Sequence, residues 1–351
     1  MSDFQEKLKN IYNWQPPKEW IKINAIDAHT GGEPLRIITS GLPELKGDTI
    51  LERRRYMKEN LDHLRTALMW EPRGHADQYG CVITPPCTEE ADFGVLFLHN
   101  EGYSTMCGHA IIAVTKIALE TGLIEMKYPE TVLKIDAPAG LITSYAQCKD
   151  GKVENVYFHN VPSFVLMENE TVKVPGLGDI KFDIAYGGAF YAYVNAKEAG
   201  VEMIADDYRN LIEKGMAIKN AVMEQFEIKH PFEEDLSFLY GTIFIGDPIN
   251  ENADSRNVCI FAEGEVDRSP TGTGVSARMA LHHHKGDLKV GEKMVIESIL
   301  GSSFTCSVKE ECTFGPHKAV IPQVEGIAHI NGKGEFLIDP EDPLKDGFIL
   351  R

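Results

Sequence analysis

Two stretches of the sequence place a potentially reactive side chain directly before a helical pattern. In NEGYSTMCGHA this side chain is the thiol of Cys107, and in DRSPTGTGVSAR it is the hydroxyl of Thr271. The first N–H groups of a helix have no partner within the helix, and the helix dipole adds a partial positive charge there. Glycines beside both positions let a ligand approach the backbone, so each helix start could bind a carboxylate or phosphate. Two such helix starts facing each other would hold one small anion from both sides.

The thiol of Cys107 is the stronger candidate for acid–base or nucleophilic chemistry. A helix N-terminus lowers the pKa of a cysteine, so we expect part of this thiol to be ionised near neutral pH. A thiolate here would be a candidate base or nucleophile, whereas the alternative role is that of a buried packing cysteine. The hydroxyl of Thr271 is not acidic at neutral pH and cannot exchange a proton as a thiol does.

The helical patterns that would carry these positions are few. They cover residues 48–70, 108–122, 205–226 and 272–286, where apolar residues recur at spacings of three and four. Strand-like runs rich in Val, Ile, Phe, Tyr and Thr are more numerous and do not alternate strictly with the helices. The sequence therefore predicts an α+β fold and not a doubly wound parallel sheet. The polar residues 1–20 are expected to form a short helix and an arm.

The two candidate helix starts also resemble each other. Laying CGHAIIAVTKI (107–117) on TGTGVSARMAL (271–281) aligns small, polar and aliphatic positions and places Ala113 on Ala277. A match this short is consistent with two related halves of the chain or with chance. We place a domain boundary near residue 150, around CKDGK.

Composition and charge exclude several classes of partner. The 351 residues are 43% hydrophobic and 25% charged, which is typical of a soluble globular protein. No apolar run approaches the roughly 18–20 residues that would span a bilayer, and the N-terminus lacks a secretory signal, so we expect a cytoplasmic protein without membrane contact. The net charge of −18 argues against nucleic acid and anionic lipid as partners.

The cysteines and histidines do not predict a metal centre. Seven cysteines, an odd number, occur without a C-x-x-C pair, which argues against a disulfide framework and against structural zinc. The run HHH at 282–284 points to different sides of a helix, so these rings cannot converge easily on one ion. We expect neither a metal nor a cofactor.

Taken together, NEGYSTMCGHA and DRSPTGTG resemble the proline racemase family, which includes 4-hydroxyproline epimerases and trans-3-hydroxy-L-proline dehydratases. Further matching segments are DAHTGGEPLRI near the start, EPRGHADQYG at 71–80 and GGAFYAYV at 187–194, so the resemblance covers nearly the whole chain. In the racemases of that family both helix starts carry a cysteine, one on each face of the substrate ring. Cys107 matches the first of these positions, but Thr271 occupies the second. The Cys/Thr pair resembles the dehydratase branch.

The resemblance implies a diaminopimelate-epimerase-like fold. Such a fold has two pseudo-symmetric α/β domains, each with a curved sheet around a central helix, and an active site in the cleft between them. On this basis the first domain is expected at 21–150, completed by 335–351, and the second at 151–334. A homodimer is the family expectation.

The resemblance also implies cofactor-independent dehydration of trans-3-hydroxy-L-proline to 1-pyrroline-2-carboxylate, with the Cys107 thiolate as the base for the α-proton. Asp267 would bind the ring ammonium, although it could also be an ordinary turn residue. Tyr79 and Phe261 stand where the family has aromatic pocket walls, but core packing explains them equally well. The expected carboxylate donors are the N–H groups of Gly108, His109, Gly272 and Thr273.

Two other functions stay open at this point. One is an isomerase, either a proline racemase or a 4-hydroxyproline epimerase, in which Thr271 or water carries the second proton. The other is a non-catalytic protein that binds imino acids.

Overall fold

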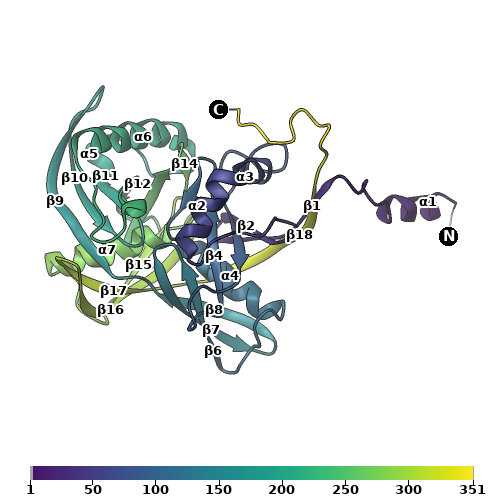
Figure 1. Cartoon of the computed structure of the whole chain (residues 1–351). Helices are drawn as coiled ribbons and strands as arrows, with labels where there is room; N and C mark the ends of the chain where they lie inside the picture. Colours follow the sequence, from purple (N-terminus) through teal and green to yellow (C-terminus); the bar gives the residue numbers. More distant parts are fainter. Residues whose placement is uncertain (1–2, 351) are drawn as a thin grey trace.

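Two buried helices, each surrounded by strands, organise the chain (Figure 1). The computed structural model describes residues 3–350. The two helices are α4, Gly108–Glu120, and α7, Gly272–Lys285. Both are buried along most of their length, which fits the apolar and small residues found on all their sides. These are the two helices that the sequence predicts after Cys107 and Thr271.

The strands before and after α4 form the first pairing unit, residues 21–159. Its remaining elements are β1 Ile21–Thr30, β2 Glu33–Ser40, α2 Ile50–Asn60, α3 Asp62–Met69, β3 Gly80–Thr84, β4 Phe93–Leu98, β5 Tyr103–Ser104, β6 Glu130–Ala137, β7 Gly140–Lys149 and β8 Lys152–His159. The single helical pattern expected at 48–70 is interrupted at Leu61, where α2 ends and α3 begins.

The strands around α7 form the second pairing unit, residues 163–326. Its remaining elements are β9 Ser163–Val174, β10 Gly178–Tyr186, β11 Phe190–Asn195, α5 Ala196–Ala199, η1 Ala205–Asp207, α6 Tyr208–Gln225, η2 Glu234–Leu236, β12 Leu239–Gly246, β13 Ser255–Phe261, β14 Glu265–Val266, β15 Lys293–Glu297, β16 Ser303–Phe314 and β17 His317–Gly326.

The same order of strand pairing recurs in both units. In the first, β2 pairs in parallel with β3, and β4 pairs in parallel with β6 across the segment that holds α4. In the second, β11 pairs in parallel with β12, and β13 pairs in parallel with β15 across the segment that holds α7. The other neighbours within each unit are antiparallel. This mixture of strands and helices confirms the predicted α+β class.

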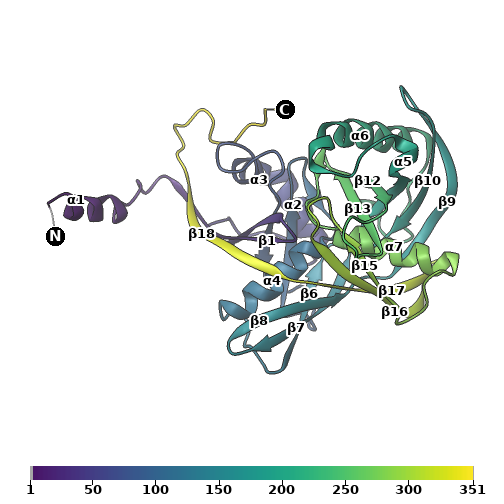
Figure 2. The same cartoon turned by 180° about the vertical axis from the view of Figure 1, so that it is seen from behind.

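The units are joined through the sheet and through the C-terminal strand. Strand β8 of the first unit pairs with β17 of the second. The last strand, β18 Ala328–Ile338, runs back and pairs antiparallel with β1 along its whole length, as Figure 2 shows from behind. The residues that follow β18 continue to the region of α3, where the N–H of Phe348 donates to the carbonyl of Glu71.

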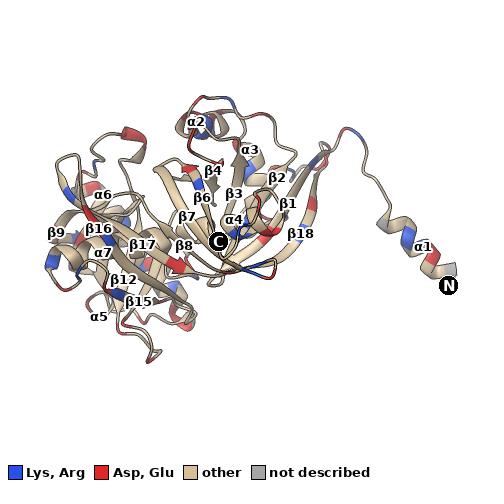
Figure 3. Cartoon of the chain, turned by 90° about the horizontal axis from the view of Figure 1, so that it is seen from below, with Lys and Arg blue, Asp and Glu red and all other residues tan. Residues whose placement is uncertain are grey.

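The N-terminal helix α1, Asp3–Tyr12, lies on an arm away from the rest of the molecule (Figure 3). Its apolar side chains Phe4, Leu8 and Ile11 are exposed. The sequence predicts this helix and arm, although the first two residues lie outside the described part. Within residues 3–350, every helix is too short or too polar to cross a membrane.

The three consecutive histidines at the end of α7 contact three separate acidic side chains. His282 lies 3.1 Å from Asp287, His283 lies 2.9 Å from Glu311, and His284 lies 3.3 Å from Glu168. The rings therefore diverge, and the residues described here contain no group of three or more His, Cys, Asp or Glu side chains placed to hold a metal ion.

Candidate active site

The two buried helices begin against each other. A Cβ atom added to Gly108 would lie 2.6 Å from the Cα atom of Gly272, and a Cβ on Gly272 would lie 2.5 Å from the Cα of Gly108. Both distances are far below a carbon–carbon contact distance of about 3.5–4.0 Å, so only glycine fits at either position. The sequence GH after Cys107 and GTG after Thr271 thus lets two positively polarised helix ends approach one point.

The residue before each helix start has a different backbone conformation. Cys107 is extended, with φ −148° and ψ 108°. Thr271 has φ 68° and ψ 91°, a left-handed conformation that β-branched residues rarely adopt. Its N–H donates to Ser269 Oγ at 3.1 Å, and its carbonyl accepts from the N–H of Val275 at 2.7 Å. Strain of this kind persists where the surroundings enforce it, as they often do at functional sites.

Cys107 and Thr271 line the same small cavity, which has a volume of about 20 Å³. This is room for about one water molecule and not for a five-membered ring with substituents. The structure therefore shows the site in a closed arrangement. The cavity is lined by Tyr79, Met106, Cys107, Gly108, His109, Tyr191, Tyr240, Phe261, Asp267, Thr271, Gly272 and Thr273.

All seven site residues named from the sequence lie around this cavity, together with Tyr79 and Phe261. Sequence reasoning missed three of the lining residues. Met106 directly precedes Cys107, and Tyr191 belongs to GGAFYAYV, so both stood within segments already singled out. Tyr240 had no local signal, because strand pairing brings β12 to the cavity from elsewhere in the chain.

The thiol of Cys107 lies beside the ring of His109. The distance from Sγ to Nδ1 is 3.1 Å. Burial lowers the pKa of His109 to about 3, against a hydrogen bond to the carbonyl of Pro34 that raises it. The imidazole is therefore neutral, and it can accept a hydrogen bond from the thiol at Nδ1.

The expected lowering of the Cys107 pKa is wrong for this closed arrangement. Burial raises the pKa of the thiol well above its usual range, and the N–H of Ala110 and the hydroxyl of Tyr79 only partly oppose this effect. The negative charges of Asp267 and Glu33 raise it further. A thiolate in a dry cavity loses its hydration, and one helix end does not compensate for that loss. Cys107 is thus a neutral thiol here.

Asp267 is the acidic group of the cavity. It is buried, and burial raises its pKa to about 6, although hydrogen bonds from Ser269 and the nearby hydroxyl of Thr271 lower it. The N–H of Ser269 donates to Oδ1 at 2.7 Å. Within the described residues, the Thr271 hydroxyl has no hydrogen bond of standard geometry, but it lies close enough to lower the pKa of Asp267. This carboxylate fits a cationic ligand group better than an apolar one.

The hairpin between β1 and β2 fixes both helix starts from one side. Thr30 Oγ1 donates to the carbonyl of His109 at 2.9 Å. The fully buried Glu33 accepts at Oε2 from the N–H of Arg268 at 2.7 Å, next to Asp267. Burial and the charge of Asp267 raise the pKa of Glu33 well above its usual range. The segment DAHTGGEP thus has a positioning role that its sequence alone did not specify.

Two tyrosines of β11 fix the first turn of α7. The hydroxyls of Tyr191 and Thr273 lie 2.6 Å apart. Tyr193 donates from its hydroxyl to the carbonyl of Gly274 at 2.7 Å. These contacts fix the first turn of α7, whose residues Gly272 and Thr273 line the cavity, and a preformed anion site requires such fixed donors.

With the geometry known, comparison with other proteins identifies the family. The family described as "Proline racemase" matches residues 25–349. The chain belongs to the proline racemase family. It is 52% identical over 341 residues to a trans-3-hydroxy-L-proline dehydratase of Colwellia psychrerythraea, covering 96% of each chain. It is 48% identical over 335 residues to the human trans-3-hydroxy-L-proline dehydratase, covering 94% of this chain and 95% of the human one.

Solved structures of the proline racemase family share the fold. A hydroxyproline epimerase from Agrobacterium vitis with bound trans-4-hydroxy-L-proline gives a TM-score of 0.90 at 33% identity, covering 95% of this chain and 96% of that one. A probable proline racemase from Agrobacterium radiobacter gives 0.89 at 32% identity, covering 93% and 96%. The resemblance inferred from the sequence motifs is confirmed.

Proposed function

We propose that this protein dehydrates trans-3-hydroxy-L-proline to 1-pyrroline-2-carboxylate. The observation that carries the proposal is a cavity with one thiol, Cys107, and a threonine, Thr271, at the two facing helix starts. The dehydratases of Colwellia psychrerythraea and human, at 52% and 48% identity, support the same reaction. The enzyme is accordingly a hydro-lyase.

The stereochemistry of the substrate explains why one thiol is sufficient. In trans-3-hydroxy-L-proline the hydroxyl and the carboxylate lie on opposite faces of the ring. The α-hydrogen is also opposite the carboxylate, so it shares a face with the leaving hydroxyl. A base and an acid on that single face can remove both groups. A racemase must instead deliver a proton to the far face, where Thr271 has no acidic group.

We assign the proton transfers to Cys107 and His109. Substrate binding brings the ring ammonium close to the thiol, which favours the thiolate, and His109 Nδ1 at 3.1 Å takes the thiol proton. The thiolate removes the α-proton, and the imidazolium protonates the departing hydroxyl, which leaves as water. The enamine that forms tautomerises to 1-pyrroline-2-carboxylate. The cycle ends with a neutral thiol and a neutral imidazole, as it began.

The two helix starts would stabilise the charge that develops during proton removal. We propose that the first N–H groups of α4 and α7, at Gly108, His109, Gly272 and Thr273, bind the substrate carboxylate. Negative charge grows on that carboxylate as the α-proton leaves, and fixed donors in a water-free site stabilise it without reorganising. Asp267 would bind the ring ammonium, which also keeps its own carboxylate ionised.

The closed cavity implies that the two pairing units separate to admit substrate. We propose that the chain has two pseudo-symmetric domains, 21–150 completed by 335–351 and 151–334, with the site in the cleft between them. The recurrence of strand pairing supports two related halves. The pairing units differ from the proposed bounds at their edges, because β8 pairs with β7 and the whole of β18 pairs with β1; residue 351 lies outside the described part. A homodimer remains an expectation from the family resemblance, and a cytoplasmic location remains a prediction from the sequence.

The test is a panel of proline and hydroxyproline stereoisomers, with pyrroline carboxylate measured as the product. We expect turnover of trans-3-hydroxy-L-proline in the wild-type enzyme and a loss of about 10²–10⁴-fold in Cys107→Ser, because serine is not a base at neutral pH. Retained dehydration in this variant would refute the role of the thiol. Deuterium incorporation at the α-carbon without water loss would identify an isomerase, and tight binding without turnover would identify a binding protein.

A further inference from the structure

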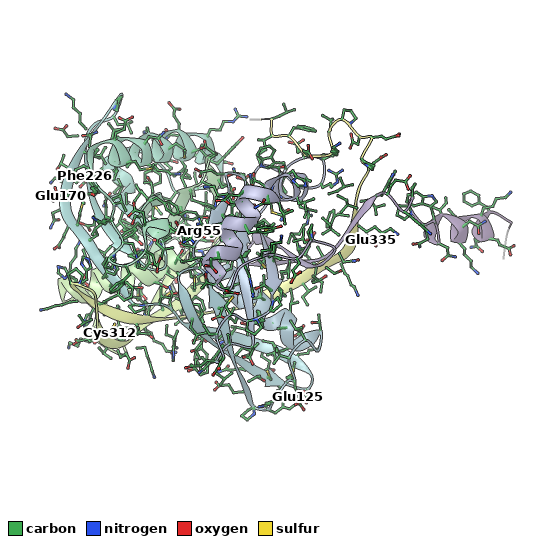
Figure 4. All side chains as sticks on the ribbon, viewed as in Figure 1. Arg55, Glu125, Glu170, Phe226, Cys312 and Glu335 are labelled. Carbon is green, nitrogen blue, oxygen red and sulfur yellow. The ribbon has the colours of Figure 1, made fainter. Side chains whose placement is uncertain are left out.

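A second cavity lies behind Tyr240, which also lines the candidate active site. Its volume is about 580 Å³, and it is bounded by α2 and the segment 99–103 of the first unit and by α6 and the segment 235–240 of the second. We call it the basic groove. Figure 4 marks Arg55 on α2, at the side that faces the second unit. The groove is lined by Arg54, Arg55, Lys58, Glu59, His99, Glu101, Gly102, Tyr103, Lys219, Met223, Asp235, Phe238, Leu239 and Tyr240.

Two cations of the basic groove already have acidic partners across the two units. Arg55 Nε lies 2.7 Å from Asp235 Oδ2, and Lys219 Nζ lies 3.7 Å from Glu101 Oε2. Lys219 also donates to the carbonyl of Ala262 at 2.8 Å. These pairs hold the units together at the groove.

Arg54 is different, because none of the residues described here places a carboxylate within ion-pair distance of it. Its Nη2 donates to the carbonyl of Tyr103 at 2.7 Å. Its Nε is buried and has no hydrogen-bond partner in the described part of the chain. Burial lowers the pKa of this guanidinium, although it stays charged. A desolvated cation with a free donor is stabilised by an anion beside it.

His99 supplies a second free donor. Its side chain is 3% exposed, and its Nδ1 accepts from the N–H groups of Glu101 at 3.3 Å and Gly102 at 3.2 Å. Because Nδ1 is the acceptor, the proton of the neutral ring resides on Nε2. This Nε2 is buried and has no partner among residues 3–350. A buried N–H without an acceptor is rare and costs free energy comparable to a lost hydrogen bond.

We propose that the basic groove binds a small oxyanion, a phosphate or a carboxylate, through the Arg54 guanidinium and the Nε2–H of His99. Lys219 adds positive charge from the second unit. The anion would thus be held by donors of the first unit and attracted by a cation of the second, which favours their closed arrangement. The site is separate from the substrate carboxylate site, which is built from backbone N–H groups of α4 and α7.

The overall negative charge of the protein argues against non-specific binding of an anion in the groove. A protein with a net charge of −18 repels anions from its surface in general, so binding requires donors built for it. Glu59, Glu101 and Asp235 also line the groove, and the last two are held by Lys219 and Arg55. Lys58 also lines the groove, but it is exposed to water. The desolvated guanidinium of Arg54 is therefore the group that decides whether an anion binds.

The test is calorimetric titration of the full chain with inorganic phosphate and, separately, with acetate at matched ionic strength. We expect Arg54→Gln to weaken binding by about tenfold or more, as expected for a lost hydrogen bond to a charged group. His99→Asn keeps an acceptor for the N–H groups of Glu101 and Gly102 but removes the Nε2–H, and should also weaken binding. Arg209→Gln, which removes a cation elsewhere on the surface, is the matched control and should bind like the wild type.

The comparison of anions identifies the source of the ligand. Tighter binding of phosphate indicates a phosphate-bearing ligand, and tighter binding of acetate indicates a carboxylate. Thermal unfolding of each variant establishes that it is folded before titration. Unchanged affinity in both Arg54→Gln and His99→Asn would place the anion elsewhere, for example at the helix starts of the active site, and overturn the proposal. Absence of binding by the wild type at about 10 mM phosphate and acetate would overturn it as well.

Discussion

Replacing Gly272 by alanine tests the contact on which the whole site depends. The added Cβ would lie 2.5 Å from the Cα of Gly108 and 3.0 Å from its carbonyl carbon, so it meets backbone and not a flexible side chain. Neither helix start can shift freely to relieve this overlap. Hydrogen bonds from β11 hold α7 in place, and hydrogen bonds from the β1–β2 hairpin hold α4. Overpacking of this kind costs about 1–3 kcal/mol of folding stability.

The effect on catalysis should exceed the effect on stability. Separation of the two helix starts moves the N–H groups of one helix away from the substrate carboxylate. Loss of one such donor typically lowers kcat by about 10²–10³-fold. We therefore expect Gly272→Ala to remain folded but to lose at least about 100-fold in the rate of pyrroline carboxylate formation.

The assay compares initial rates and thermal unfolding for the wild type, Gly272→Ala and a control. Gly334 in β18 is the control, because a Cβ there meets no atom of residues 3–350 within 4 Å. Gly334→Ala should retain the wild-type rate and stability. If Gly272→Ala has wild-type kcat and an unchanged unfolding midpoint, the facing helix starts do not form the carboxylate site, and the reasoning fails.

Three further predictions follow from the same cavity. Thr271→Cys places a second thiol at the far helix start, so exchange of deuterium into the α-position of proline should become measurable by mass spectrometry. If no exchange occurs, residues 107 and 271 do not lie on opposite faces of the substrate ring. Because the pKa of Asp267 is raised to about 6 and substrate binding uses its ionised form, kcat/KM should fall as the pH drops below about 6. Asp267→Asn should lose most of its activity, and its remaining kcat/KM should no longer show this fall at low pH. Because the pKa of Cys107 is raised by burial, iodoacetamide should react slowly with the substrate-free enzyme near neutral pH and faster as the pH rises, and rapid alkylation at pH 6 would contradict a neutral thiol.

Local sequence features were sufficient to predict six of the seven site residues that line the cavity, because these six stand at the two helix starts, whereas Asp267 was predicted from the family resemblance. A cysteine or threonine followed by glycine before an apolar helical pattern can be recognised as a helix start from the local sequence alone, without knowledge of the rest of the fold. The α+β class also followed from the excess of strand-like runs over helices. The repeat of CGHAIIAVTKI in TGTGVSARMAL left relatedness open, and the repeated order of strand pairing now supports it.

Properties that depend on the assembled fold could not be predicted. The contribution of Tyr240 requires β12 to pair in parallel with β11, a contact between segments about fifty residues apart. The left-handed backbone of Thr271 depends on its contacts with Ser269 and Val275. The sign of the Cys107 pKa shift depends on burial by both units, which no helix-start pattern contains.

In the proposed mechanism, the neutral Cys107–His109 pair explains why a threonine is acceptable at the second helix start. A racemase that uses two thiols must hold them in opposite protonation states, one on each face of the ring, so both positions need an acidic group. For elimination on one face, the proton acceptor and the proton donor must instead lie side by side, and Sγ and Nδ1 are 3.1 Å apart. The thiol and imidazole together hold one transferable proton. The reaction uses one proton to protonate the leaving hydroxyl and returns one from the α-carbon, so the pair ends in its starting state. On this proposal no proton has to be transferred on the far face, and a threonine there can shape the cavity without taking part in acid–base chemistry.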